Sequence, residues 1–509
     1  MTFDVIIVGG GPAGLFLATE LRLAGARPLV LERRPGPDQA DKAHGLAGQV
    51  VRLLDHRGLL DRCGSPGAPR PAPGFFFGGL PLPLHLLGAD NPMHLLPINQ
   101  RDLERVLAER AAELGAEVRR GWEVRSFAQY GDRVEVVARG LDGTETTLAA
   151  RYLVGCDGSR SSVRKQAGIA FAGGEDEHTV DRSALIGPSD RIRFLPGGRV
   201  AIEGLGEIPA AFHRTGRGVF TLLGHDPQRP LINTAEWEQH PDGDHPGPGT
   251  PMTLAEMEAS VERVLGVRLP LSPPPEGAPR MLRRMSGRSY RIAERYRAGR
   301  VFLAGDAAHV SHGPTLNLAL QDAANLAWKL AAVVRGSAGD GLLATYESER
   351  RAGAERVIMH TRAASALLAP GDDVTALRAL FAELLTGAGN LRLVAGLVAG
   401  SDVRYDMGGD QRAEPTGRFA PPLDVTTADG QVRRLAELQR DARPLLLDLT
   451  GGTALAAVAE PWTGVRRVAA TAPDSPAPAL LIRPDGYVAW AGDDPDGLKA
   501  ALIRWFSPS

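Results

Sequence analysis

The feature that most restricts the fold is a glycine motif directly after a short apolar run. Residues 3–8, FDVIIV, predict a buried strand, and the period of LFLATELRLAGA predicts a helix after GGGPAG. In Gly9-x-Gly11-x-x-Gly14 the first glycine permits a tight turn, the second lets a pyrophosphate approach, and the third lets the helix pack on the strand. PLVLERR predicts the next strand. The whole is typical of a nucleotide-binding β–α–β unit of about 30 residues.

Phosphates would be held at the start of this helix, where free backbone N–H groups and the helix dipole favour negative charge. Glu32 stands 23 residues after Gly9, at the end of the second predicted strand, where a carboxylate can accept hydrogen bonds from a ribose diol. A structural glycine turn and an exposed strand-end charge are the alternatives. The contacts predicted in this unit are Gly9, Gly11, Pro12, Ala13, Gly14, Glu32 and Arg33.

Length and charge limit the class of protein. The 509 residues predict two to four domains, and 58 basic against 60 acidic side chains leave a net charge of −2. This balance argues against a nucleic-acid partner. The two cysteines, Cys63 and Cys156, form no CxxC motif, so neither a disulfide framework nor a metal site is expected. No signal peptide or apolar span of 18 residues is apparent, which predicts a cytoplasmic protein without a membrane span.

Two further motifs extend the nucleotide unit. LVGCDGSRSSVRKQAGI contains the pattern DGxxSxVR, matched by Asp157, Gly158, Ser161, Val163 and Arg164, and GRVFLAGDAAH contains the Gly305–Asp306 pair. Together with the glycine motif, these signatures resemble those of the class A, single-component FAD-dependent aromatic monooxygenases of the para-hydroxybenzoate hydroxylase fold. The resemblance covers nearly the whole chain.

The C-terminal part narrows the resemblance. GRFAPPLDVTTADGQVRRLAEL, PLLLDL and ALLIRPDGYVAWAG are similar to the thioredoxin-like tail of phenol hydroxylase-type members, above all the bacterial aromatic polyketide hydroxylases and rifampicin monooxygenases. The tail lacks CxxC, so it is expected to pack or to dimerise rather than to perform thiol chemistry. We therefore expect an α/β fold with a Rossmann-like FAD-binding domain, an inserted mixed β-sheet substrate domain and a C-terminal thioredoxin-like domain.

The domain boundaries follow from the motifs and the composition. The predicted segments are 1–72, 98–174 and 283–400 for the FAD-binding domain with its long helices, 73–97 and 175–282 for the substrate domain, 401–414 for a linker and 415–509 for the thioredoxin-like domain. INQRDLERVLAERAAELG predicts a helix capped by Asn99 and stopped by Gly115.

The resemblance implies roles for particular residues. Asp306 would bind the ribityl or ribose part of FAD, Asp157 would lie near the pyrophosphate, and Arg164 would order that segment. The alternative for Asp157 and Arg164 is a structural salt bridge, and for the Gln100–Arg101 pair it is a solvated helical turn. The cofactor contacts implied outside the first unit are Gln100, Arg101, Asp157, Arg164, Gly305, Asp306, Pro314, Leu316 and Asn317.

The implied reaction depends on the cofactor. NADPH or NADH, as a transient co-substrate, would reduce FAD, O2 would add at flavin C4a, and the hydroperoxide would transfer one oxygen to an electron-rich ring. The implied substrate is a polycyclic aromatic, polyketide-type metabolite, which would be hydroxylated or undergo a related oxygen insertion. A reductase that does not oxygenate its substrate is a further alternative. The protein would be a monomer or a homodimer.

One loop departs from the family pattern. Between GDAAH and LN the family has a glycine-rich segment, but VSHGPT contains only Gly313 and Pro314 and is about three residues shorter. Lys42 and His44 also replace an Arg-containing segment. Two hypotheses follow: a reshaped loop still admits FAD, or the flavin is lost and the protein has a hydrolase, cyclase or binding role. The intact phosphate motif favours the first.

A few residues near this loop have two interpretations each. His309 and His312 are the candidate catalytic residues, as pH-tuned acids or bases, but each is also explained by packing or by exposure in the loop. Ser311 or Thr315 could cap the next helix. Phe75, Phe76 and Phe77 are candidate substrate contacts. Alternation along a strand requires that at least one of them faces a core.

Overall fold

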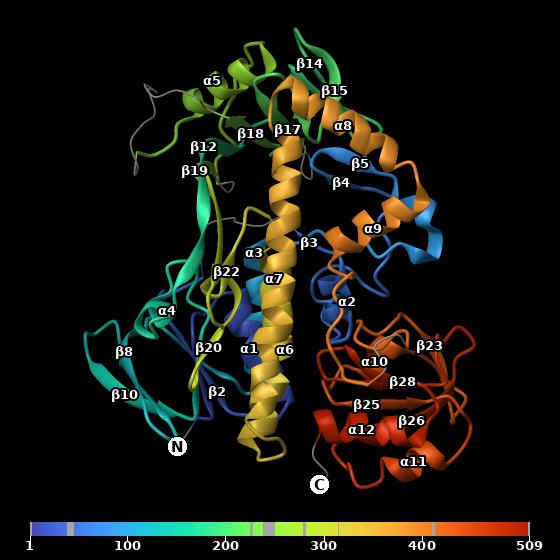
Figure 1. The fold of residues 1–509 in the computed structure, drawn as a ribbon. Helices are drawn as coiled ribbons and strands as arrows, with labels where there is room; N and C mark the ends of the chain where they lie inside the picture. The colour runs from blue at the N-terminus through green and yellow to red at the C-terminus, as the bar shows by residue number, and fades with distance from the viewer. Residues whose placement is uncertain are drawn as a thin grey trace.

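The computed structural model describes residues 3–37, 45–223, 228–237, 250–277, 281–313, 315–409 and 413–506. Figure 1 shows the N-terminal sheet with its helices below and the substrate-domain sheet above. The C-terminal domain lies at the lower right, beside α6 (Thr315–Val334). The long helix α7, Gly341–Leu368, runs through the middle of the molecule and joins these levels. It packs against α6, α8 (Asp372–Leu384) and β19 (Leu282–Ala293).

The first sheet has the order β20-β21-β11-β1-β2-β7. Its centre, β1 (Val5–Val8), is parallel to β2 (Pro28–Glu32) and β11 (Tyr152–Gly155), and α1 (Pro12–Leu23) follows β1 directly. The predicted strand–turn–helix–strand unit is thereby confirmed. The remaining elements of this domain are β3 (Leu46–Ala47), α2 (Gln49–Asp55), β6 (Leu95–Leu96), α3 (Gln100–Glu113), β7 (Glu117–Arg120), β8 (Glu123–Gln129), β9 (Val134–Arg139), β10 (Glu145–Ala150), α4 (Ser162–Gln166), β20 (Arg297–Ala298), β21 (Val301–Leu303) and η2 (Gly305–Ala307).

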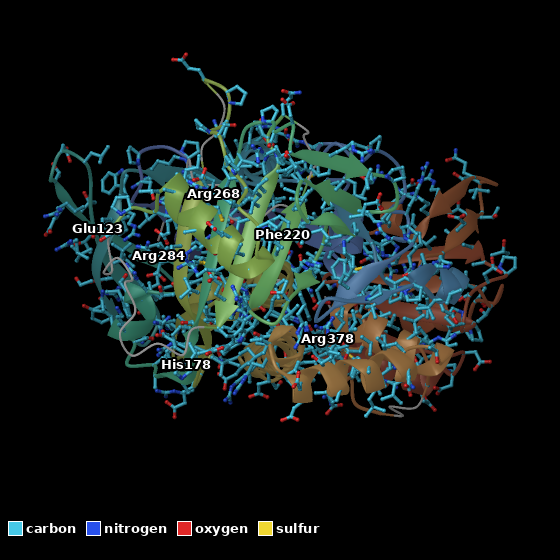
Figure 2. The ribbon with its side chains drawn as sticks, turned by 90° about the horizontal axis from the view of Figure 1, so that it is seen from above. Glu123, His178, Phe220, Arg268, Arg284 and Arg378 are labelled. Carbon is cyan, nitrogen blue, oxygen red and sulfur yellow. The ribbon has the colours of Figure 1, made fainter. Side chains whose placement is uncertain are left out.

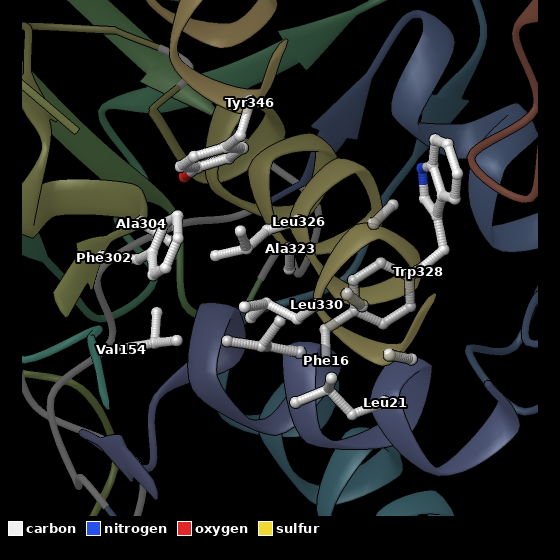
Figure 3. Close-up of a cluster of buried hydrophobic side chains, with 14 of the residues drawn as sticks. Phe16, Leu21, Val154, Phe302, Ala304, Ala323, Leu326, Trp328, Leu330 and Tyr346 are labelled. Atoms are coloured by element: carbon white, nitrogen blue, oxygen red, sulfur yellow. The ribbon is translucent and has the colours of Figure 1, made fainter. Parts of the chain in front are cut away.

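The main core lies between this sheet and the helices α1 and α6. Phe16 and Leu21 from α1 meet Leu326 and Leu330 from α6, and Val154 from the sheet approaches the same cluster (Figure 3). Most of these side chains are fully buried. At about 25 cal/mol for each Å² of apolar surface removed from water, a core of this size contributes strongly to stability. It also fixes the start of α6 relative to the turn after β1.

Helix α3 begins and ends as its sequence predicts. The side chain of Asn99 accepts a hydrogen bond from the backbone N–H of Asp102 at 2.8 Å, as an N-cap does. Gly115 takes a positive φ of 75° just after the helix. The helix packs against α1 and presents Gln100 toward the first sheet's turn region.

The substrate domain has a six-stranded sheet in the order β16-β17-β18-β12-β19-β22. A mixed sheet was expected, but every pairing among the described residues is antiparallel. Short connections between β16, β17 and β18 favour antiparallel pairing there, whereas the central pairs of β12 with β18 and β19 join strands about 45 to 100 residues apart and are set by the tertiary fold. The strands are β12 (Phe171–Leu185), β16 (His213–Arg214), β17 (Gly218–Leu223), β18 (Leu231–Trp237), β19 (Leu282–Ala293) and β22 (His309–Val310), with β13 (Ile192–Leu195), β14 (Arg199–Ile202) and β15 (Gly206–Pro209) in a separate small sheet.

Helix α5, Leu254–Leu265, packs on the substrate-domain sheet. The hydrophobic cluster between them contains the fully buried Phe220, which Figure 2 shows from above. Arg182 lies buried under α5 and donates hydrogen bonds to Glu236 at 2.7 Å and to Glu256 at 3.0 Å. Strands β12 and β19 cross the predicted boundaries at 174/175 and 282/283, so the two domains share two continuous strands.

A second helical layer lies beyond α7. Its α8 (Asp372–Leu384) is held to the β4–β5 hairpin by Arg378, which donates to the carbonyls of Gly78 and Leu367. Among the described residues no single helix is long and apolar enough to cross a membrane, although α8 and α9 together, bent by 111°, satisfy length and composition. The elements here are β4 (Phe75–Phe77), β5 (Leu80–Leu82), η1 (Leu84–Asp90), α8 and α9 (Ala388–Ala399).

The C-terminal domain forms the sheet β24-β23-β26-β25-β27-β28. Strand β25 (Leu445–Asp448) is parallel to β26 (Arg466–Thr471) and antiparallel to β27 (Ala479–Ile482). Its remaining elements are β23 (Asp424–Thr427), β24 (Val432–Arg434), α10 (Leu435–Leu438), α11 (Ala454–Val458), β28 (Val488–Ala491) and α12 (Pro495–Trp505). The predicted strands and final helix are thus present.

Candidate functional site

The turn after β1 depends on two close backbone approaches. Gly9 has a φ of +111°, and a Cβ there would overlap the carbonyl of Cys156 on the neighbouring strand. A Cβ at Gly14 would overlap the carbonyl oxygen of Gly9. A Cβ at Gly11, by contrast, would meet nothing within 4 Å. Gly9 and Gly14 therefore serve the packing of the turn, and Gly11 leaves an open approach to the backbone.

Glu32 ends β2 beside this turn. Its Oε2 accepts the backbone N–H of Gly10 at 2.6 Å, and its Oε1 accepts the N–H of Arg34 at 2.9 Å. The carboxylate is therefore held in place by backbone donors, and each oxygen keeps a lone pair for another donor. An ordered carboxylate at this place suits a ribose diol better than a freely moving surface charge would.

A single cavity of about 410 Å³ begins at this turn and reaches the start of α6. It brings together segments that are far apart in the sequence: the β1 turn, the end of β2, α3, the Asp157 segment, and the Asp306 turn. The predicted residues along its wall are Gly9, Gly11, Pro12, Ala13, Glu32, Arg33, Gln100, Asp157, Asp306 and Leu316. Arg101 is exposed on α3 and Asn317 hydrogen-bonds Ala47, so neither lies in this wall.

Asp157 binds the first turn of the short helix α4, whose N-cap is Ser161. Its carboxylate accepts the Ser161 hydroxyl, the Ser162 N–H at 2.7 Å and the Val163 N–H at 3.2 Å. Arg164 points elsewhere and donates to the carbonyl of Ala307 at 3.0 Å. The structure therefore shows no Asp157–Arg164 ion pair among the described residues. Arg164 instead ties the DGxxSxVR segment to the Gly305–Asp306 turn.

The Gly305–Asp306 turn rests on a buried ionic cluster. The N–H of Gly305 donates to Oδ2 of Asp322 at 3.1 Å, and Nε2 of His309 lies 2.6 Å from the same oxygen. Arg350 donates from Nε to the other oxygen, Oδ1, at 2.7 Å. Burial raises the pKa of Asp322, but His309 and Arg350 outweigh it and the pKa is lowered. A charged carboxylate thus holds this turn.

The two candidate histidines lie in different surroundings. His309 is only 1% exposed and is engaged with Asp322, which favours its packing role over catalysis. His312 is partly exposed, with Nε2 3.8 Å from Oδ2 of Asp181 on the substrate-domain sheet. The pKa of His312 is lowered, mainly by burial and further by Arg288 and Arg283, while Asp181 raises it by a smaller amount. A neutral imidazole at neutral pH follows.

The shortened loop is compact. After β22, Gly313 lies against Thr361 of α7, and α6 begins at Thr315. Thr315 lines the cavity from the first turn of α6, so this helix start faces the cavity directly. The hydroxyl of Ser311 is buried without a hydrogen-bond partner among the described residues, so it does not cap α6. Pro314, Lys42 and His44 lie outside the described residues.

The three phenylalanines of β4 separate as strand alternation requires. Phe77 is buried and stacks on Phe381 of α8 with ring centroids 5.7 Å apart. Phe76 is 38% exposed and approaches Phe212 of the substrate domain at 5.4 Å. Phe77 is therefore a core residue, as the alternation predicted for at least one of the three, while Phe76 and the half-buried Phe75 remain candidate substrate contacts.

Several residues of the cavity wall were not among the cofactor contacts predicted from the sequence. The additional wall residues are Val8, Leu31, Arg34, Glu104, Trp122, Glu123, Val124, Cys156, Gly158, Arg160, Ser162, Thr315 and Ala319. Asp322 and Arg350 do not touch the cavity, yet they hold its Gly305 turn. An acid and an arginine on helices give no periodic pattern that would separate them from solvated charges. Only their zero exposure identifies them.

The cavity fits the FAD that the motifs imply. The open face at Gly11 and the N-terminus of α1 suit a pyrophosphate, and the held carboxylate of Glu32 suits a ribose. At the other end, the first turn of α6 offers backbone N–H groups toward a ring that gains negative charge on reduction. The residues present thus match both halves of the cofactor.

Comparison with known proteins gives the same result. Residues 2–361 match the family described as FAD binding domain, and residues 413–509 match the family described as aromatic-ring hydroxylase, C-terminal. The chain covers both family regions in the order in which the structure places its domains.

Relatives and a solved structure match along the full length. The 12-dehydrotetracycline 5-monooxygenase/anhydrotetracycline 6-monooxygenase of Streptomyces rimosus is 40% identical, over 100% of this chain and 99% of the relative. The rifampicin monooxygenase of Rhodococcus hoagii is 37% identical, over 99% of this chain and 98% of the relative. The dialkyldecalin synthase of Streptomyces rugosporus is also 37% identical, over 100% of both chains. The structure of an anhydrotetracycline hydroxylase from Streptomyces rimosus superimposes with a TM-score of 0.84 at 37% identity, over 100% of both chains.

Proposed function

The chain belongs to the FAD-binding aromatic-ring hydroxylases and is an FAD-dependent monooxygenase, and from this premise we propose that its substrate is a polycyclic aromatic, polyketide-type metabolite. The observation that carries the proposal is the full-length likeness to monooxygenases named for tetracycline and rifampicin substrates, while the cavity from the Gly9–Gly14 turn to the first turn of α6 accounts for the cofactor. When bound, FAD supplies the oxygen-transfer chemistry, with electrons from NAD(P)H. The named substrates of the tetracycline and rifampicin relatives support a large ring system.

The cofactor contacts that we propose follow the cavity. Gly11 and the start of α1 hold the pyrophosphate, Glu32 the ribose, and Asp306 the ribityl chain. Asp157 shapes the pyrophosphate region through its hydrogen bond to the first turn of α4. Each of these groups positions the cofactor without exchanging a proton with it. The protein therefore contributes binding and orientation.

We propose His312 as the group that accepts a proton from a phenolic hydroxyl of the substrate. It extends from the loop between β22 and α6 toward the substrate-domain sheet, where Asp181 can stabilise the imidazolium that forms. Asp181 is itself held by Arg288, which donates to its Oδ1 at 2.7 Å. Deprotonation makes the ring more electron-rich, which favours attack on an electrophilic oxygen.

The pH dependence tests this role. Because the pKa of His312 is lowered, the base is available at neutral pH, and kcat/KM should fall only as the pH drops through that lowered value. His312→Asn should lose this limb and about 10²-fold in kcat/KM. His178→Asn, on an exposed part of β12, is the control. An unchanged pH profile in His312→Asn would refute the assignment.

The activity itself is tested in two stages. The visible spectrum of the purified protein, before and after incubation with FAD and desalting, measures whether the short loop still closes on the flavin. NADPH or NADH oxidation with fused-ring phenols under ¹⁸O₂ then measures oxygen incorporation. One labelled oxygen atom in the product supports the proposal. A protein that retains no FAD contradicts it.

One further outcome has a precedent among the relatives. A protein that holds FAD but incorporates no labelled oxygen into any aromatic substrate would contradict hydroxylation. It would favour a ring-forming role, since a relative named dialkyldecalin synthase shares 37% identity over the full chain. The shortened VSHGPT loop is the feature of this chain that motivates including that outcome.

A further inference from the structure

A buried pair of tyrosines joins the C-terminal domain to the segment that precedes it. Tyr487 lies at the turn between β27 and β28, and its ring stacks on Tyr405, which precedes the C-terminal domain, with centroids 4.0 Å apart and planes at 22°. Both side chains are only 3% exposed. Stacked tyrosines that keep their hydroxyls inside a protein need partners for them. The hydrogen-bond partners of the two hydroxyls connect this pair to two different segments of the protein.

The first direction leads to the Gly305 turn. The hydroxyl of Tyr405 accepts a hydrogen bond from Nη1 of Arg350 at 2.7 Å, and Nε of Arg350 binds Asp322 at 2.7 Å. Asp322 in turn accepts the N–H of Gly305 at 3.1 Å, next to Asp306 in the cavity wall. The path from the tyrosine pair to the cavity therefore consists of two side chains, both fully buried.

The second direction leads to the segment on the other side of α6's first turn. Nε2 of Gln49, at the start of α2, donates to the hydroxyl of Tyr487 at 2.8 Å. Two residues before it, Ala47 exchanges two hydrogen bonds with the side chain of Asn317, at 3.0 and 3.4 Å. Asn317 follows the cavity residue Leu316. One tyrosine thus reaches both the Gly305 turn and the base of α6.

A separate set of ion pairs keeps this tyrosine in place. Arg483, in the same hairpin, donates to both oxygens of Glu349 on α7, at 2.7 and 2.8 Å. Lys329 on α6 binds Glu349 at 2.8 Å, and Asn325 donates to Asp485 at 3.1 Å. All these groups are buried. The hairpin is therefore attached rigidly to α6 and α7, and Tyr487 can transmit its position to the cavity.

We propose that Tyr487 is a positioning residue for the flavin cavity: through Tyr405 and Arg350 it sets the Gly305–Asp306 turn, and through Gln49 it sets the base of α6. The C-terminal domain then has a defined task besides packing, which is to brace these two segments of the cavity wall. The inference rests on the binding of FAD in this cavity, but not on which substrate is hydroxylated.

The direct test is Tyr487→Phe in the full chain, which keeps the stacked ring and removes the hydroxyl. Loss of one buried hydrogen bond should raise the Kd of FAD about 2- to 10-fold and shift the visible flavin band. The matched control is Trp462→Phe, which removes a hydrogen bond of 2.9 Å to Phe506 within the same domain and touches no cavity residue. It should lower Tm without changing the Kd or the spectrum.

A double-mutant cycle with Gln49→Met isolates the proposed contact. If the hydroxyl of Tyr487 acts through Gln49, the effects of the two substitutions on the Kd of FAD will not be additive. Additive effects, or a Tyr487→Phe protein with wild-type Kd and spectrum, would overturn the proposal. A rise in Kd that tracks the fall in Tm equally in Tyr487→Phe and Trp462→Phe would also overturn it.

Amide hydrogen exchange supplies a readout that needs no flavin. In the apoprotein, Tyr487→Leu, which removes the ring stacked on Tyr405, should speed exchange of the Gly305 N–H, which donates to Asp322, and Trp462→Phe should not. Equal exchange in all three proteins would overturn the proposal. Since this measurement involves neither NAD(P)H nor an aromatic substrate, it separates failure of the brace from failure of the hydroxylase function.

Discussion

The two ends of the flavin cavity are built in different ways. At the Gly9 end, the backbone makes the site: Gly14 packs against Gly9, and Glu32 is fixed by two backbone N–H groups. At the Gly305 end, buried side chains make it, since Asp322 and Arg350 stand 17 and 45 residues beyond the glycine that they hold. One end is local and the other depends on several elements.

This difference teaches how each end can fail. The close approaches at Gly9 and Gly14 leave no room for an added atom, because neighbouring strands and helices cannot move apart without unfolding. A site held by side chains loses stability and cofactor affinity in proportion to the number of buried polar groups that a substitution leaves without a hydrogen-bond or charge partner. The substitutions below separate the two cases, from the largest expected effect to the smallest.

Gly14→Ala should have the largest effect, with a loss of more than about 4 kcal/mol in the free energy of unfolding, since the new Cβ overlaps the Gly9 carbonyl. The matched control is Gly11→Ala, where the Cβ meets nothing within 4 Å. It should fold and yet bind FAD poorly, because the methyl group occupies the pyrophosphate approach. Denaturant unfolding and FAD titration measure the two. A stable Gly14→Ala protein would contradict the backbone model of this end.

Asp322→Asn tests the Gly305 end. It leaves the fully buried Arg350 without its charge partner and should cost about 3–5 kcal/mol of stability. Asp340→Asn removes the exposed Arg297 pair and should change stability by less than about 1 kcal/mol. Thermal unfolding and FAD affinity are measured together for both. Equal, small losses in the two variants would show that the buried cluster does not hold the turn.

Glu349, in the separate set of ion pairs that joins the C-terminal domain to α6 and α7, gives the fold a pH dependence. Burial raises its pKa, but Arg483 and Lys329 outweigh burial and lower the pKa from 4.5 to about 2. A lowered carboxyl pKa stabilises the fold above pH 4.5, and that contribution, about 3 kcal/mol, is lost as the pH falls from 4.5 toward 2. Glu349→Gln should be less stable at pH 6 and should lack this part of the acid transition. A wild-type acid profile in the variant would rule out the coupling.

Glu32→Gln should have the smallest effect. The amide oxygen still accepts one of the two backbone N–H groups, but the amide N–H₂ then faces the other N–H, which is also a donor. The negative charge that favours a ribose diol is lost as well. We expect a Kd for FAD about 10-fold higher and little change in Tm. Glu123→Gln, on another part of the cavity wall, is the control. If both raise the Kd equally, charge in the cavity and not the held carboxylate is responsible.

By itself, the sequence determined the β–turn–α–β unit, the helix capped by Asn99, the C-terminal strands and the membership in the family. These depend on contacts between near neighbours or on short motifs whose geometry is nearly invariant. The tertiary structure alone decided the antiparallel pairing of the substrate sheet, the different surroundings of His309 and His312, and the link from Tyr487 to Gly305. Those features arise where segments from different elements of the fold meet. Burial, which no local pattern encodes, makes ordinary polar residues into a precise support.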